Sequence, residues 1–140
     1  MKVVAYNVKT FEKEFLAKAN DKKHDITLIS NALTLQTADY AKGKMAVLVS
    51  TSDDVGARVI NKLADLGIRY IATRSRGMDH IDQAAAKLMG IKLADAGSYP
   101  ARGIANLPIT QQQASLIQED LQEIAEQTIR NLDMWQAENN

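Results

Sequence analysis

Short runs of apolar and β-branched residues alternate with segments of helical period along the first 95 residues. Five runs have the length and composition of buried strands. They span residues 3–6, 24–29, 45–49, 68–73 and 91–94. The intervening segments repeat apolar side chains three and four positions apart, which predicts amphipathic helices. These helices are expected at residues 10–19, 34–41, 55–66 and 83–89.

Two helix exits are nearly copies of each other, Leu66-Gly67-Ile68-Arg69 and Met89-Gly90-Ile91-Lys92. A glycine just past a helix adopts the left-handed conformation that closes the last turn, and the β-branched residue after it starts a strand. Consecutive units of this kind predict a parallel sheet with right-handed crossovers and helices on both faces. The expected fold is α/β, a flavodoxin-like doubly wound domain with five parallel strands.

The pattern changes after Asp95. Residues 96–110 hold both prolines of the chain and two glycines, which indicates an extended connection. Beyond them, Ser115 and Gln118 fit a capping box, and apolar residues share one helical stripe as far as Trp135. A final helix is therefore expected to pack back on the sheet, with Trp135 as a core or edge anchor.

Composition narrows the function classes without naming one. Lys+Arg and Asp+Glu both count 17, so no charge excess favours nucleic acid or an anionic membrane as a partner. Cysteine is absent, which excludes disulfides, thiolate metal ligands and a cysteine nucleophile. The sequence has no secretory leader pattern and no apolar stretch of membrane-spanning length. The expectation is a soluble cytoplasmic protein.

Residues 73–82, TRSRGMDHID, carry the clearest chemical signal. A strand that ends in a polar, glycine-containing turn and runs into a helix presents backbone N–H groups to an anion. Gly77 has two interpretations, a turn that needs positive φ or a surviving anion site. His80 is expected to be a turn residue rather than a catalytic base.

The remaining polar candidates have structural interpretations. His24 follows a charged run and is expected to be a solvated loop residue. Asp79 and Asp82 precede a helix and are expected to cap it, and Asp53 or Asp54 is available to cap the helix at 55–66. No set of residues has the spacing of a metal site.

Four passages together resemble the substrate-binding, or catalytic, domain of the NAD-dependent D-2-hydroxyacid dehydrogenases, in the D-lactate dehydrogenase branch. They are MKVVAYNVKTFEKEFL, LADLGIRYIATRSRGMDHIDQAAAKLMGIKLAD, SYP, and ITQQQASLIQEDLQEIAEQTIRNL. In that family a Rossmann domain interrupts the substrate domain. The resemblance implies an N-terminal part at 1–100, a join at 101–106 in place of the NAD domain, and a returning segment at 107–140.

The same resemblance assigns the site. It implies that the turn of Ser75, Arg76 and Gly77 holds the substrate carboxylate and that Tyr99 lies on the substrate side. It places Gln112 where the family has its general-acid histidine, and glutamine cannot carry a proton near neutral pH. The seven glycines contain no G-x-G pair, so no dinucleotide fingerprint can be drawn and no cofactor is expected for this chain.

Several functions stay open. The first is an isolated substrate domain without turnover, engineered by excision and resurfacing at Arg76, Gln112 and Ser115, or a decayed natural homologue. The second is weak binding of 2-oxo or 2-hydroxy acids, and the third is a half-enzyme that needs a separate NAD domain. A flavin carrier or phospho-receiver lacks the required loop residues. A monomer is expected, with a homodimer as the alternative.

Overall fold

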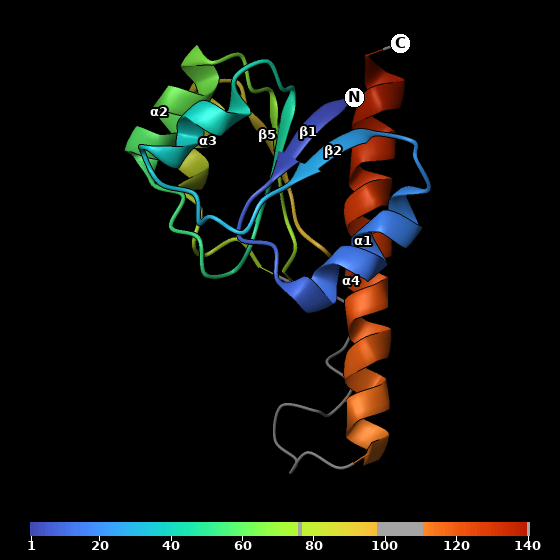
Figure 1. Ribbon diagram of the computed structural model, residues 1–140. Coiled ribbons are helices and arrows are strands. Elements are labelled where there is room, and N and C mark those ends of the chain that lie inside the picture. The colour runs from blue at the N-terminus through green and yellow to red at the C-terminus, as the bar shows by residue number, and fades with distance from the viewer. Residues whose placement is uncertain (76, 98–110, 140) are drawn as a thin grey trace.

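The computed structural model describes residues 1–75, 77–97 and 111–139, and of residues 111–119 it describes the backbone alone. A five-stranded sheet forms the centre (Figure 1). Its strands are β1 (Lys2–Ala5), β2 (Asp25–Leu28), β3 (Ala46–Val49), β4 (Tyr70–Thr73) and β5 (Lys92–Ala94). All pair in parallel in the order β2-β1-β3-β4-β5. This confirms the doubly wound, flavodoxin-like prediction.

Helices cover both faces of the sheet (Figure 1). One face carries α2 (Ala57–Asp65), α3 (Gln83–Leu88) and the short 3-10 helix η1 (Thr37–Ala41). The other carries α1 (Thr10–Asn20) and the long α4 (Gln111–Glu138). Because successive side chains of a strand point to opposite faces, Val4 packs toward α2 while Val3 and Ala5 pack toward α4. The central strands are thus buried on both sides.

Helix α4 packs back on the sheet, as predicted. The Trp135 ring stacks on the Tyr70 ring with their centroids 4.8 Å apart, and Trp135 is 2% exposed. The Asn131 side-chain amide also donates to the Asp95 carbonyl at 2.8 Å. Because Tyr70 belongs to β4 and Asp95 follows β5, these contacts fix α4 across this half of the sheet.

The glycines at the two copied helix exits behave as predicted. Gly67 has φ 95° and Gly90 has φ 74°, both in the left-handed region. The residue after each glycine donates back into the preceding helix, Ile68 to Leu63 and Ile91 to Ala86. Each glycine therefore reverses the chain into the next strand.

Two helix predictions need correction. The helix expected at 55–66 begins at Ala57 behind Gly56, and no side chain caps it. Val55 instead forms a bridge with Ile81, and Asp53 points inward to other partners. The helix expected at 34–41 is a 3-10 helix of five residues, because the start of the segment is held by Thr34 and Thr37 bonding each other.

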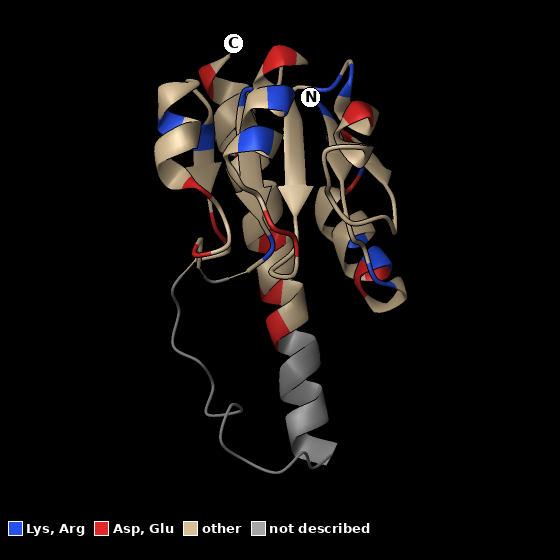
Figure 2. Cartoon of the chain, turned by 90° about the vertical axis from the view of Figure 1, so that its left-hand side faces the viewer, with Lys and Arg blue, Asp and Glu red and all other residues tan. Residues whose placement is uncertain are grey.

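Charged residues of both signs lie interspersed over the described part of the chain (Figure 2). This agrees with the equal counts of acidic and basic residues. Within the described residues, no helix has the length and apolar character to cross a bilayer.

Candidate functional site

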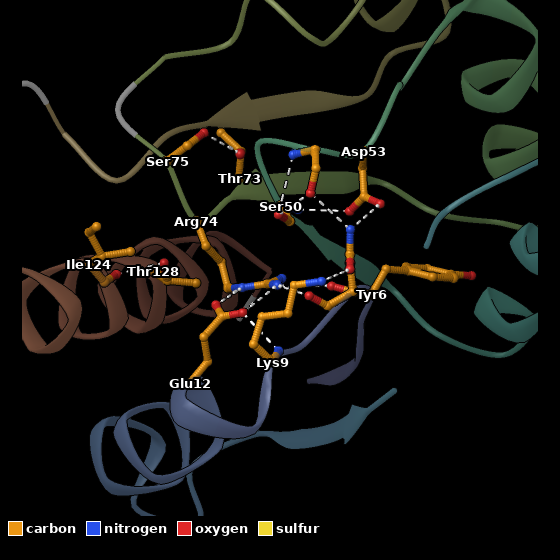
Figure 3. A network of polar contacts seen from close by, with 12 residues as sticks. Tyr6, Lys9, Glu12, Ser50, Asp53, Thr73, Arg74, Ser75, Ile124 and Thr128 are labelled. Atoms are coloured by element: carbon orange, nitrogen blue, oxygen red, sulfur yellow. Dashed lines mark hydrogen bonds and ion pairs between the residues drawn. The ribbon is translucent and has the colours of Figure 1, made fainter. Parts of the chain in front are cut away.

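The turn that follows β4 lies at the carboxyl end of the sheet, where ligands bind in open parallel α/β folds. Its neighbours are the segments that follow β1 and β3 (Figure 3). The Arg74 N–H donates to the Val49 carbonyl at 2.9 Å, and Ala96 N–H donates to the Ser75 carbonyl at 2.7 Å. The start of the turn is thus tied to β3 on one side and to the exit of β5 on the other.

The Arg74 side chain is a buried anchor that sequence analysis missed. Its guanidinium is 2% exposed and pairs with Glu12 of α1 through Nε and Oε2 at 2.8 Å. Its Nη2 donates to the carbonyls of Tyr6 and Asn7 at 2.9 and 3.2 Å (Figure 3). Nη1 is buried and has no hydrogen-bond partner among the described residues. One arginine therefore joins β4, the exit of β1 and α1.

Polar side chains hold the turn internally. Thr73 Oγ1 lies 2.6 Å from Ser75 Oγ and 3.0 Å from His80 Nε2. Ser75 Oγ donates to the Gly77 carbonyl at 3.0 Å. The His80 carbonyl accepts from Val55 N–H, so His80 is held by both its backbone and its ring. His80 is a turn residue, as predicted, but with a defined side-chain partner.

Gly77 has neither a positive φ nor a close neighbour that a side chain would strike. The left-handed glycines among the described residues are 43, 67, 90 and 97, and a Cβ built at Gly77 meets nothing within 4 Å. The conformational explanation for Gly77 is therefore wrong, because its φ lies outside the left-handed region that favours glycine. Among the described residues, the N–H groups of Ser75, Gly77 and Met78 have no hydrogen-bond acceptor. The described part of the turn therefore has backbone N–H donors that are left without an acceptor.

A second polar group lies beside the turn, at the exits of β1 and β3. Asp53 is 1% exposed, and its carboxylate accepts from Ser50 N–H at 2.8 Å (Figure 3). It also accepts from Leu33 N–H at 3.0 Å and from the Asn7 amide at 3.3 Å. A carboxylate with three donors is a structural anchor. The sequence showed Asp53 and Asp54 as candidate caps, but it could not show that Asn7 and Leu33 donate to Asp53.

Tyr6 closes the other side of this region. Its hydroxyl donates to the Thr37 carbonyl at 2.6 Å. Burial raises the pKa of the Tyr6 hydroxyl, and the nearby Asp39 carboxylate adds to the rise. Tyr6 therefore stays a neutral donor.

Two predictions about isolated polar residues have clear outcomes. His24 is wrong as a solvated loop residue: its side chain is 3% exposed, and Nε2 lies 2.8 Å from Asp133 Oδ1 of α4. Asp82 is a helix cap, as predicted, because its side chain accepts from Ala85 N–H at 3.0 Å. No such bond is found for Asp79 among the described residues.

The structure brings together only part of the predicted site. Ser75 and Gly77 lie in the described turn. Arg76, Tyr99 and the predicted join at 101–106 lie outside the described residues. Gln112 lies in the first turn of α4, where only the backbone is described. The described residues contain no cluster of histidine and acidic side chains that could hold a metal ion.

Residues 3–140 match the family model described as "D-isomer specific 2-hydroxyacid dehydrogenase, catalytic domain". This chain belongs to that family. A similar curated relative is the D-lactate dehydrogenase of Lactiplantibacillus pentosus, 34% identical over 113 residues, which are 79% of this chain and 34% of that protein. Another is the 2-hydroxyacid dehydrogenase homolog of Zymomonas mobilis, 31% identical over 78% of this chain and 33% of that protein. The chain spans about a third of the length of the curated relatives it matches.

Solved structures of this family agree with the fold. The apo structure of D-lactate dehydrogenase from Escherichia coli superposes with a TM-score of 0.68 at 32% identity, over 71% of this chain and 32% of that one. D-2-hydroxyisocaproate dehydrogenase superposes with a TM-score of 0.68 at 26% identity, over 89% of this chain and 41% of that one. The structure described as the NAD complex from Lactobacillus delbrueckii gives 0.64 at 26%, over 75% and 32%. The resemblance read from the sequence is confirmed.

Proposed function

We propose that this chain is the substrate-binding half of a D-2-hydroxyacid dehydrogenase and binds a small 2-oxo or 2-hydroxy acid at residues 75–77. One observation carries the proposal. A rigidly anchored turn at the carboxyl end of β4 presents the N–H groups of Ser75, Gly77 and Met78, which have no acceptor among the described residues. Backbone N–H groups arranged in this way suit a carboxylate.

We infer that the chain alone does not reduce such an acid. In the family's reaction NADH gives a hydride to the 2-oxo acid and becomes NAD, and the printed sequence contains no G-x-G pair for a dinucleotide. Gln112, at the position that the resemblance gives to the acid, has no titratable proton near neutral pH. In this proposal residues 101–106 join the two parts of the substrate domain. Excision of the NAD domain explains the absence of a G-x-G pair, and resurfacing explains the glutamine at position 112.

The affinity should be low because only one wall of the site is present. Roughly 1 mM corresponds to about −4 kcal/mol, a gain that a few backbone hydrogen bonds to a carboxylate supply once the cost of immobilising the ligand is subtracted. Dissociation constants at or above the millimolar range are expected, with Tyr99 as an added contact on the substrate side.

Binding is tested by titrating pyruvate and D-lactate while following backbone amide resonances. The amides of Gly77 and Met78 should shift, while chloride at equal ionic strength should leave them in place. Gly77→Ala should weaken the response because its methyl group lies where the ligand approaches. Gly56→Ala, which also has open space at its Cβ, is the matched control. No amide shift at high millimolar acid would reject the proposal.

Turnover is tested by adding a separately produced NAD domain from a relative and measuring NADH oxidation with pyruvate. We expect no activity with Gln112 and measurable activity with Gln112→His. Activity with glutamine in place would contradict the assignment of the acid. Light scattering over a concentration range tests the expected monomer against a homodimer.

A further inference from the structure

Hydroxyl and imidazole groups in the substrate turn form a continuous chain whose proton positions can be assigned. The Gly77 carbonyl can only accept, so the Ser75 hydroxyl proton must lie toward it, at a donor to acceptor distance of 3.0 Å. Ser75 Oγ then has only acceptor capacity left for Thr73, 2.6 Å away. The Thr73 hydroxyl proton therefore lies toward Ser75.

The same count of donors and acceptors assigns the proton on the His80 ring. With its one proton directed to Ser75, Thr73 Oγ1 can only accept from His80 Nε2 at 3.0 Å. His80 must therefore carry a hydrogen on Nε2. The order is fixed as His80 Nε2–H to Thr73, Thr73 O–H to Ser75, and Ser75 O–H to the Gly77 carbonyl. Thr73 is 0% exposed, so water does not compete for its hydroxyl.

This chain ends on the peptide group that joins Gly77 to Met78. In a trans peptide the carbonyl and the N–H point in opposite directions. Holding the Gly77 carbonyl against Ser75 therefore directs the Met78 N–H away from Ser75. That N–H is one of the donors without an acceptor among the described residues. The histidine thus acts on a ligand donor through three hydrogen bonds.

We propose that His80 is a positioning residue that sets the orientation of the Gly77–Met78 peptide, with Thr73 and Ser75 as the intermediate links. This inference rests on the proposed binding of a 2-oxo or 2-hydroxy acid at residues 75–77. It assigns His80 no contact with the ligand and no proton transfer.

Thr73→Val tests the chain because it removes the central hydroxyl and keeps the side-chain shape. Thr128→Val is the matched control: Thr128 is also 0% exposed, and its hydroxyl donates to the Ile124 carbonyl of its own helix (Figure 3). Imidazole ¹⁵N shifts report the tautomer of His80, and the carbonyl ¹³C shift of Gly77 reports its hydrogen bond. Both should change in Thr73→Val and stay unchanged in Thr128→Val.

Pyruvate titration of the same variants separates the two proposals. We expect the dissociation constant to rise about 5-fold in Thr73→Val, which is about 1 kcal/mol, the typical value of one hydrogen bond. Two results would contradict the assigned chain of hydrogen bonds: an Nδ1–H tautomer of His80 in the wild type, or an unchanged ¹³C shift of the Gly77 carbonyl in Thr73→Val. If the wild type shows the expected His80 and Gly77 signals but does not bind pyruvate, the proposed function is rejected and the assigned chain of hydrogen bonds is retained. Equal affinities in wild type and Thr73→Val would overturn the positioning role.

Discussion

Replacing Arg74 by methionine tests the claim that one buried guanidinium holds the substrate turn against β1 and α1. The change removes the ion pair with Glu12 and the donors to the Tyr6 and Asn7 carbonyls but keeps an apolar side chain of comparable length. Breaking one side of a buried pair costs about 3–5 kcal/mol. Nη1 is buried without a partner, and removing it returns about 1–3 kcal/mol.

The midpoints of these two ranges differ by about 2 kcal/mol, which is the net loss expected in the free energy of unfolding. For a domain of this size this loss corresponds to a fall in Tm of about 8 °C. Urea unfolding followed by the fluorescence of Trp135 measures the change, and the m-value should stay constant because the surface exposed on unfolding is the same. Arg130→Met is the matched control and should cost less than about 0.5 kcal/mol, because Arg130 is exposed and Gln127 is its hydrogen-bond partner in the described part of the chain.

A double-mutant cycle with Glu12→Gln isolates the pair. The effects of the two single changes should be non-additive by more than about 1 kcal/mol, because either change already removes the charge that the other residue pairs with. An Arg74→Met variant as stable as Arg130→Met, or a cycle that is additive, would show that Arg74 is not the anchor described here.

The other predictions concern packing, backbone conformation and pH. Trp135→Ala should cost about 3–5 kcal/mol, since the ring stacks on Tyr70 in the core; a change below 1 kcal/mol in urea unfolding would contradict this. Gly67→Ala should cost about 1–2 kcal/mol because φ is 95°, whereas Gly77→Ala should leave stability unchanged; equal effects in thermal melts would refute the distinction. Burial raises the pKa of Asp133, but hydrogen bonds and charge from Lys23 and His24 lower it by more, so the net shift of the pKa is downward. Its contribution is present above the ordinary carboxyl pKa and lost as pH falls through the lowered one, so the stability gap to Asp133→Asn should shrink in acid. A gap independent of pH would exclude this.

The alternation of strands and helices was readable because it depends on local physics. A run such as residues 45–49 is apolar throughout, as a strand covered on both faces must be, and the observed β3 is buried at every position. Gly67 and Gly90 were placed by the backbone requirement of a helix end, which any sequence must meet in the same way. The alternation of strands and helices predicted a parallel sheet with right-handed crossovers, whereas the order of its strands came from the structure.

The polar interior was not readable, because its members lie far apart in the chain. His24 looked like a surface residue among charges, yet its partner Asp133 lies 109 positions away. Asp53 looked like a helix cap for the same reason: besides the nearby Ser50 N–H, its donors lie on Asn7 and Leu33, which only the folded sheet brings near. Local pattern cannot distinguish a solvated charge from one that is satisfied by a distant donor.

The sequence by itself therefore determined the fold, the family and the segment of the candidate site, since periodicity, helix ends and motif residues are properties of neighbouring positions. The tertiary structure decided how that segment is held. Arg74 finds Glu12 across 62 positions, and Gly77 proves to be free of the left-handed conformation that its residue type suggested. The physical reason is that hydrogen bonds in a buried site are satisfied by whatever the fold brings within reach, and that geometry is set by packing of the whole sheet.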